Sequence, residues 1–219
     1  MPIRIRQHVN PLARKFQQPI ALPNWQEIYN NPTRDLHLDI GCARGRFLRE
    51  MALANPETNF LGIEIRQALV SNANQIRDEL NLTNLHYLFG NMNSSAQVLL
   101  QSLHSNSLKT ISVQFPDPWF KKRHNKRRVV QPELVKIAID HLAVGGRVFL
   151  QSDIEEVAIQ MRDRFADSPL LTQQHSSTWL DTNPFAIPTE RELYVLEQNL
   201  PVYRAMFQKS AIVLDTQAI

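Results

Sequence analysis

Short apolar runs alternate with longer amphipathic stretches from residue 36 to residue 166. The short runs have the length of buried strands, whereas the longer stretches repeat apolar residues at helical spacing, as Phe47, Leu48 and Met51 do. The predicted strands cover residues 36–40, 59–65, 85–89, 108–115 and 146–151, and the predicted helices cover residues 45–54, 66–80, 94–103, 130–142 and 154–166. This alternation predicts an α/β fold with right-handed crossovers and a parallel sheet covered by helices on both faces.

The two ends of the chain are less regular than its centre. Residues 1–34 contain prolines at positions 2, 11, 19, 23 and 32, so we expect an irregular N-terminal arm, made basic by Arg4, Arg6, Arg14 and Lys15. Residues 35–219 show no internal repeat and no linker-like change in composition, which predicts a single domain. Near the C-terminus, residues 203–214 are predicted to close the sheet with an antiparallel strand.

Polar residues gather where the predicted strands end. In an open parallel sheet, ligands bind outside the carboxyl ends of the strands. Five predicted strands end in residues suited to such a site, namely Asp39 to Gly41, Glu64, Gly90 with Asn91, residues 116–119, and Ser152 with Asp153. The alternative interpretation is that polar residues only mark the points where strands stop.

The loop after the first predicted strand, residues 39–45, reads Asp-Ile-Gly-Cys-Ala-Arg-Gly. A dinucleotide-binding loop needs the spacing G-x-G-x-x-G, but Ala43 and Arg46 occupy the second and third glycine positions counted from Gly41. A long arginine where the helix packs on the strand argues against that motif. The observed spacing, acidic-x-G-x-x-x-G, is typical of the first motif of S-adenosylmethionine-dependent methyltransferases.

Two further strand ends are suited to a nucleoside. Glu64 follows Gly45 by 19 residues, and a carboxylate at this position can accept hydrogen bonds from both ribose hydroxyls. NAD-dependent enzymes share this feature, so Glu64 alone does not choose the cofactor. The side-chain amide of Asn91 can read an adenine edge, or Asn91 can be a simple turn residue after Gly90.

The positive charge of the chain is concentrated in one segment. The 219 residues include 24 Lys and Arg against 21 Asp and Glu, a formal net charge of +3. Six cations lie between residues 121 and 128, so the remaining residues together carry −3. Clusters this dense commonly bind phosphate. A nuclear localisation signal is the alternative, but it needs an exposed tail, whereas this cluster follows a predicted core strand.

The remaining composition limits the class of protein. The chain has 43% hydrophobic residues, and no apolar run approaches the roughly 18 to 20 residues of a membrane span. No signal-peptide pattern follows the N-terminal cations, and a single cysteine, Cys42, fits a reducing cytosol. We therefore expect a cytoplasmic globular protein that crosses no membrane. The isolated histidines show no metal-ligand spacing, so we expect no metal site.

The segment that precedes the cations holds a rigidly placed acid. Pro116 and Pro118 flank Asp117 and restrict the backbone around it, as a substrate-facing carboxylate requires. Trp119 can stack on a base or cover the core.

Residues 115–128, Phe-Pro-Asp-Pro-Trp-Phe-Lys-Lys-Arg-His-Asn-Lys-Arg-Arg, resemble the central motif of bacterial tRNA (guanine-N7-)-methyltransferases. The resemblance extends from about residue 36 to the end of the chain and includes the loop 39–45, the segment 62–64 and a late T-x-x-E segment at residues 189–192. Two departures are Ala43, where a glycine is frequent, and Leu193, where related proteins often continue with Lys-Phe. This resemblance implies a Rossmann-like methyltransferase fold with a mostly parallel seven-stranded sheet. It also implies S-adenosylmethionine as cofactor and the guanine at position 46 of the tRNA variable loop as substrate.

The resemblance also assigns residues to roles. Those implied around S-adenosylmethionine are Asp39, Gly41, Gly45, Glu64, Asn91 and Asp117. Asp117 also matches the catalytic position, and the substrate-binding positions match Lys121, Asp153, Thr189, Glu190, Arg191 and Glu192. For tRNA phosphates we expect contacts from Lys122, Arg123, Lys126, Arg127 and Arg128. The protein is expected to act as a monomer or homodimer without an obligatory protein partner.

Three other functions compete with this one. A non-catalytic RNA-binding module accounts for the cations but not for the acidic strand ends, because carboxylates repel phosphate. A dehydrogenase accounts for Glu64 and the first loop but not for Arg46. An exocyclic-amine methyltransferase also has a proline-containing turn after the fourth strand, but its D/N-P-P-aromatic order differs from Pro-Asp-Pro-Trp followed by cations.

Overall fold

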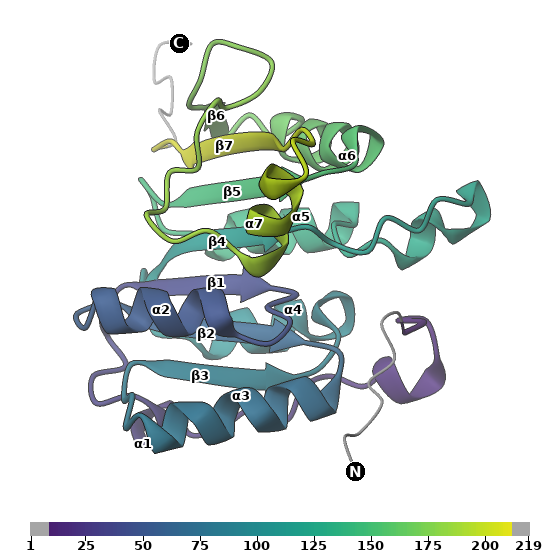
Figure 1. Ribbon diagram of the computed structural model, residues 1–219. Coiled ribbons are helices and arrows are strands. Elements are labelled where there is room, and N and C mark those ends of the chain that lie inside the picture. Colours follow the sequence, from purple (N-terminus) through teal and green to yellow (C-terminus); the bar gives the residue numbers. More distant parts are fainter. Residues whose placement is uncertain (1–8, 212–219) are drawn as a thin grey trace, which may run out of the picture.

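Residues 9–211, which the computed structural model describes, form a seven-stranded sheet with helices on both faces (Figure 1). The strand order is β3-β2-β1-β4-β5-β7-β6, and β7 pairs antiparallel with both β5 and β6, while the other pairs are parallel. The strands are β1 (Leu36–Ile40), β2 (Asn59–Glu64), β3 (Leu85–Phe89), β4 (Leu108–Gln114), β5 (Arg147–Ser152), β6 (Leu171–Gln173) and β7 (Tyr203–Lys209). The predicted fold class, including the antiparallel closing strand, is confirmed.

The helices divide between the two faces. Figure 1 shows α2, α3 and α7 on one face and α4, α5 and α6 on the other. The helices are α1 (Trp25–Ile28), α2 (Arg46–Ala54), α3 (Gln67–Glu79), α4 (Met92–Ser102), α5 (Pro132–His141), α6 (Glu155–Ala166) and α7 (Glu190–Glu197), with short 3₁₀ helices η1 (Arg14–Phe16) and η2 (Lys122–Arg127). Among residues 9–211, no helix has the length and apolar character that a membrane span requires.

The predicted strands and helices up to residue 166 agree with the structure to within two residues at each end. The pattern missed three short elements, namely α1 in the segment expected to be irregular, and β6 and α7 in the proline-rich last third of the chain. The predicted closing strand ends at Lys209, and residues 212–214 of that prediction lie outside the described residues.

Strand alternation separates an apolar sheet face from a more polar one. In β1, Leu36, Leu38 and Ile40 belong to the main hydrophobic cluster beneath α4, α5 and α6. His37 and Asp39 are also buried but point to the other face, where His37 packs against Phe47 of α2. Leu38 has no exposed surface, and truncating such a residue to alanine costs about 2–5 kcal/mol. The apolar side chains of β1 therefore anchor the strand in the main core, while its polar side chains lie on the other face of the sheet.

The described part of the N-terminal arm packs on this sheet. Phe16, Ile20 and Tyr29 are buried, and the Tyr29 hydroxyl donates a hydrogen bond to the carbonyl of Phe60 at 3.0 Å. A Cβ at Gly90 would clash with Ile20, so this glycine permits the close approach. Arg4 and Arg6, which we expected to make the arm basic, lie outside the described residues, and the division of the chain at residue 34 stays a prediction.

Candidate active site

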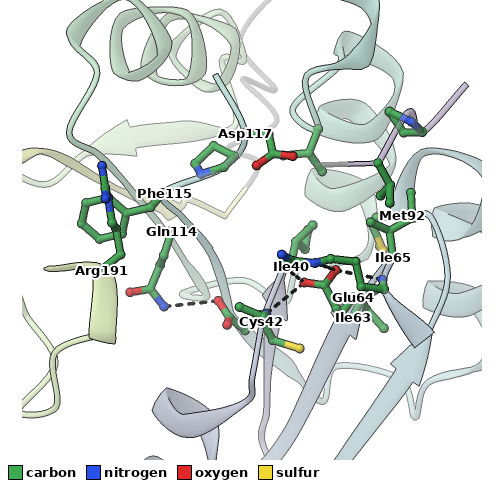
Figure 2. Close-up of a pocket in the computed structure, with 18 of the residues that line it drawn as sticks. Ile40, Cys42, Ile63, Glu64, Ile65, Met92, Gln114, Phe115, Asp117 and Arg191 are labelled. Carbon is green, nitrogen blue, oxygen red and sulfur yellow. Dashed lines mark hydrogen bonds and ion pairs between the residues drawn. The ribbon is translucent and has the colours of Figure 1, made fainter. Parts of the chain in front are cut away.

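A cavity of about 530 Å³ lies at the carboxyl ends of the strands. Figure 2 shows Glu64 and Gln114 at strand ends, with Asp117 on the loop beyond them. The predicted site residues that line the cavity are Asp39, Gly41, Glu64, Asn91, Asp117, Arg127, Asp153, Thr189, Glu190 and Arg191. Those that do not line it are Gly45, Lys121, Lys122, Arg123, Lys126, Arg128 and Glu192.

The two glycines of the first loop have different tasks. Gly41 has a φ of +87°, and a Cβ added there would meet nothing within 4 Å, so a ligand can approach its backbone closely. Gly45 has a φ of +74° and precedes the first residue of α2. A Cβ on Gly45 would lie 2.5 Å from the ring of Tyr87, whose hydroxyl donates to the Gly45 carbonyl at 2.6 Å. Gly45 is therefore required for packing beneath the loop rather than for contact with the cavity.

Asp39 is a buried acid at the end of β1. Its Oδ1 accepts hydrogen bonds from the Ser112 hydroxyl at 2.5 Å and from Gln114 Nε2 at 3.2 Å. Burial raises the pKa of Asp39 to about 6. Burial also lowers the pKa of His37 to about 3, so this imidazole is neutral at physiological pH. Because Ser112 donates to Asp39, His37 Nε2 donates to the Ser112 oxygen at 2.8 Å.

Glu64 is held from two directions. Its Oε2 accepts from the backbone N–H of Ala43 at 3.1 Å, and its Oε1 accepts from the backbone N–H of Arg66 at 2.9 Å (Figure 2). The Arg66 side chain adds an ion pair, with 2.8 Å between Nε and Oε1. This hydrogen bond, with further help from the charge of Asp117, raises the pKa of Arg66. The sequence pattern did not identify Arg66, because a cation after a strand carries no distinctive spacing.

The amide of Asn91 is already engaged. Its Nδ2 donates to the carbonyls of Pro11 and Phe16, both at 3.2 Å, and its Oδ1 accepts from the backbone N–H of Asn93 as the cap of α4. The turn interpretation therefore describes this side chain better than the adenine-reading one. Val9 and Pro11 line the cavity, so the N-terminal segment held by Asn91 forms part of its wall.

Asp117 lies on a turn with strained backbone on both sides. Phe115 and Trp119 have φ values of +49° and +44°, which residues other than glycine rarely adopt. The Phe115 N–H donates to the Gln151 carbonyl at 2.8 Å, which joins the turn to β5. Arg128 Nε donates to the Pro118 carbonyl at 2.7 Å. The turn that carries Asp117 is thus tied to the sheet at one end and to Arg128 at the other.

The six cations of residues 121–128 have two different environments. Lys121, Lys122, Arg123 and Lys126 are exposed, and their segment projects beyond the strand ends in Figure 1. Arg127 lies over the ring of Trp119, 4.8 Å from its centroid, at the edge of the cavity. Arg128 is only 4% exposed and pairs with Glu156 at 2.7 Å. Arg128 is therefore an internal anchor and is not placed to contact phosphate.

The residues of the last predicted segment, 189–192, also differ in their environments. Thr189 caps α7 by accepting a hydrogen bond from the Glu192 N–H at 3.1 Å, and Arg191 pairs with Asp153 at the cavity. Glu192 is 1% exposed and forms an ion pair with Arg204 at 2.7 Å, so its carboxylate points into the protein. In residues 9–211, no group of three or more His, Cys, Asp or Glu side chains is placed to hold a metal ion.

Comparisons with known proteins identify the family of the chain. The sequence profile of a family described as "Putative methyltransferase" matches residues 33–205. The tRNA (guanine-N(7)-)-methyltransferase of Microcystis aeruginosa is 55% identical over 206 residues, which are 94% of this chain and 98% of that protein. The protein of the same name from Nostoc sp. is 54% identical over 209 residues, 95% of each chain.

A solved structure supports the fold independently. The crystal structure of a 30S ribosomal methyltransferase from an uncultured bacterium has a TM-score of 0.56 to this chain. The match covers 86% of this chain and 95% of that one at 18% sequence identity, so it shows the fold alone. With the profile match and the two close relatives, the resemblance first seen in residues 115–128 is confirmed. The chain belongs to the bacterial family of tRNA (guanine-N(7)-)-methyltransferases.

Proposed function

We propose that this protein transfers the methyl group of S-adenosylmethionine to N7 of the guanine at position 46 in the variable loop of tRNA. The cavity carries this proposal, because it joins the acids Asp39 and Glu64 at the strand ends to Asp117 on the opposite loop. The name of the relatives supplies the base and the atom. Position 46 rests on the resemblance of residues 115–128 to the family motif.

The cavity residues fit the proposed cofactor. A volume of about 530 Å³ lies within the range of small-molecule sites, roughly 300–1,000 Å³. Gly41 leaves open space next to the backbone, and Asp39 offers negative charge to a cationic ligand. Glu64 accepts hydrogen bonds from ribose hydroxyls in place of those it now accepts from the Arg66 guanidinium. When bound, S-adenosylmethionine supplies an electrophilic methyl group on a sulfonium centre.

The chemistry of guanine N7 determines what the protein must supply. This nitrogen has an in-plane lone pair and no proton, so the reaction needs no general base. Alignment of the two reactants can lower the free energy of activation by about 7–11 kcal/mol at best. Asp117 accepts hydrogen bonds from the N–H groups of the base or stabilises the positive charge that develops on the methylated purine.

The exposed cations provide the docking surface in this proposal. Lys121, Lys122, Arg123 and Lys126 lie on the segment that projects past the cavity, where they can meet tRNA phosphates. Folded tRNA is recognised through shape and phosphate positions, and the target base is exposed before transfer. We assign methyl transfer to a single domain of residues 35–219, and place the reaction in the cytoplasm, where tRNA is found.

The experiment compares two tRNA transcripts that differ only at position 46. Purified protein is incubated with labelled S-adenosylmethionine and a transcript that carries guanine or adenine there. We expect label in the guanine transcript only, and mass spectrometry of its nucleosides should identify N7-methylguanosine. Equal labelling of both transcripts would overturn position 46, and labelling of an exocyclic amine would overturn the N7 assignment.

A further inference from the structure

Four buried polar side chains form a row across the face of the sheet that α7 covers. Asp39, Gln114, Gln151 and Arg204 come from β1, β4, β5 and β7 and are each at most 8% exposed. Gln114 lies opposite Gln151 in the register of β4 and β5, and Gln151 lies opposite Arg204 in the register of β5 and β7. Strands covered on both faces are normally apolar at their centres, and an unpaired polar group there is costly. The row therefore depends on its own hydrogen bonds.

The first half of the row runs from the cavity into the sheet. Gln114 Nε2 donates to Asp39 Oδ1 at 3.2 Å (Figure 2), and Gln151 Nε2 donates to Gln114 Oε1 at 2.8 Å. Asp39 and Gln114 both line the cavity, whereas Gln151 has no exposed surface. Gln151 is thus one hydrogen bond away from the cavity without touching it.

The second half runs from the sheet to α7. Gln151 Nε2 also donates to Glu192 Oε2 at 3.2 Å, and Gln151 Oε1 accepts from Arg204 Nε at 3.3 Å. Arg204 pairs with Glu192 Oε1 at 2.7 Å, while Asn183 Nδ2 donates to Glu192 Oε2 at 2.7 Å. Glu192 lies in the first turn of α7, directly after Arg191, which lines the cavity from the opposite side.

The direction of every hydrogen bond in the row is fixed. Ionised carboxylates only accept and a guanidinium only donates, so Asp39, Glu192 and Arg204 determine which way each amide faces. Turning over Gln114 or Gln151 would place two acceptors or two donors against each other. Buried networks of this kind behave as a unit, because each bond polarises its neighbours and a missing member leaves the others unsatisfied.

We propose that Gln114 and Gln151 are positioning residues that couple the methyl-donor side of the cavity at Asp39 to the substrate side at Arg191. A ligand next to Asp39 then restricts the start of α7 through the two amides. The names of the two sides rest on the proposed function, but the coupling itself requires only that a ligand binds at Asp39. No contact between Gln151 and either ligand is needed.

Hydrogen exchange in α7 measures this coupling without RNA. Exchange of the amides of residues 189–197 is followed with and without S-adenosylhomocysteine, in the wild type and in Gln151→Met, which keeps the side-chain length and removes the hydrogen bonds. We expect the compound to slow exchange about three- to thirtyfold in the wild type and less than twofold in Gln151→Met. Binding of the compound is verified for each protein by calorimetry.

The matched control is another buried amide far from the cavity. Asn84 is 5% exposed, and its Nδ2 donates to the carbonyls of Ala52, Asn55 and Thr58. Asn84→Leu removes comparable hydrogen bonds, so it should lower stability but leave the effect of S-adenosylhomocysteine on α7 intact. Gln114→Met is the second test variant if Gln151→Met does not fold. Where both fold, the double variant should lose no more coupling than either single variant, because they interrupt one path.

Catalysis gives a second readout. In tRNA methylation, Gln151→Met should lower kcat/KM for tRNA by about three- to thirtyfold, with Asn84→Leu close to the wild type. The coupling is overturned if S-adenosylhomocysteine leaves α7 exchange unchanged in the wild type, or slows it equally in Gln151→Met. Absence of tRNA methylation by the wild type would count against the proposed function alone, since the exchange measurement contains no RNA.

Discussion

The two sides of the cavity are built from different kinds of interaction. On the strand-end side, Asp39, Glu64 and Asn91 are at most 6% exposed, and each is held by hydrogen bonds to neighbouring backbone or side chains. On the opposite side, Arg191 is half exposed, and the cations of residues 121–126 extend into solvent. One side is fixed before any ligand arrives, whereas the other can adjust to its ligand.

This difference corresponds to the two proposed ligands. A small nucleoside cofactor is recognised through short-range hydrogen bonds, which need side chains held within a few tenths of an ångström. A large polyanion is recognised through long-range attraction, which tolerates movement but weakens with salt. Substitutions on the two sides should therefore impair different steps of the reaction, and Asp117, the proposed catalytic position, should be the most sensitive one.

The largest effect is expected from Asp117→Ala. In the proposed mechanism the carboxylate orients the base or stabilises its developing charge, so its loss should lower kcat at least about 10²- to 10³-fold. The fold should survive, because the turn is held by backbone contacts to Gln151 and Arg128 and not by the Asp117 side chain alone. Initial rates of tRNA methylation measure the loss of kcat, and a thermal melt shows whether the fold survives. Full activity in this variant would remove Asp117 from its assigned role.

A smaller effect, on tRNA affinity and its dependence on salt, should distinguish the exposed cations from the buried Arg128. Replacing Lys122, Arg123 and Lys126 together with alanine should weaken tRNA binding. The slope of log affinity against log salt should fall by roughly 0.7–0.9 for each tRNA phosphate that the variant no longer neutralises. The unfolding temperature should change little, because these side chains are exposed. Binding is measured by titration at several salt concentrations.

Arg128→Met is the matched variant within the same segment. Arg128 is 4% exposed and bonds to the Pro118 carbonyl and to Glu156, so its loss should cost about 1–3 kcal/mol of folding stability. For a chain of this size each kcal/mol lowers the unfolding temperature by roughly 2–4 °C. The salt dependence of tRNA binding should stay as in the wild type. A changed slope in Arg128→Met, or an unchanged slope in the triple variant, would contradict the division of the cluster.

The sequence predicted where the site lies better than what each residue does there. The carboxyl ends of parallel strands meet at one edge of the sheet, so a local pattern sufficed to gather Asp39, Glu64 and Asp117. The role of Arg128 depends on Glu156, 28 positions later, and such pairing has no local signal. The six cations among residues 121–128 therefore looked equivalent in the sequence, although the fold buries one of them.

Two missed features did carry a signal. Thr189 and Glu192 have the spacing of a capping box, which marks the start of α7 despite the prolines at positions 184, 188 and 201. Gln114 and Gln151 are polar residues next to strand ends, as Asp39 and Glu64 are. Their hydrogen bonds to each other could not be predicted, since they depend on the register of β4 against β5.

The smallest effect is expected from pH on the strand-end side. The buried Asp39 has a pKa of about 6, above that of an exposed aspartate, so its protonated form favours the fold and this contribution is lost as pH rises through 6. Binding of a cationic ligand instead favours the ionised form of Asp39, because only the carboxylate attracts a cation. His37 stays neutral throughout this range, since burial lowers its pKa to about 3.

Affinity for S-adenosylmethionine should therefore fall as the pH is lowered from 7 to 5, by at most about tenfold for each pH unit below 6. Calorimetry across this range measures it, and Asp39→Asn, which cannot ionise, should bind more weakly at pH 7 and show a flat profile. A wild-type profile that is also flat would place the cationic end of the cofactor away from Asp39. Salt should have little influence on the wild-type profile, because Asp39 is 4% exposed and screening acts mainly on charges in solvent. A pH effect that survives high salt, beside tRNA binding that does not, would show that the two sides of the cavity use different physical interactions.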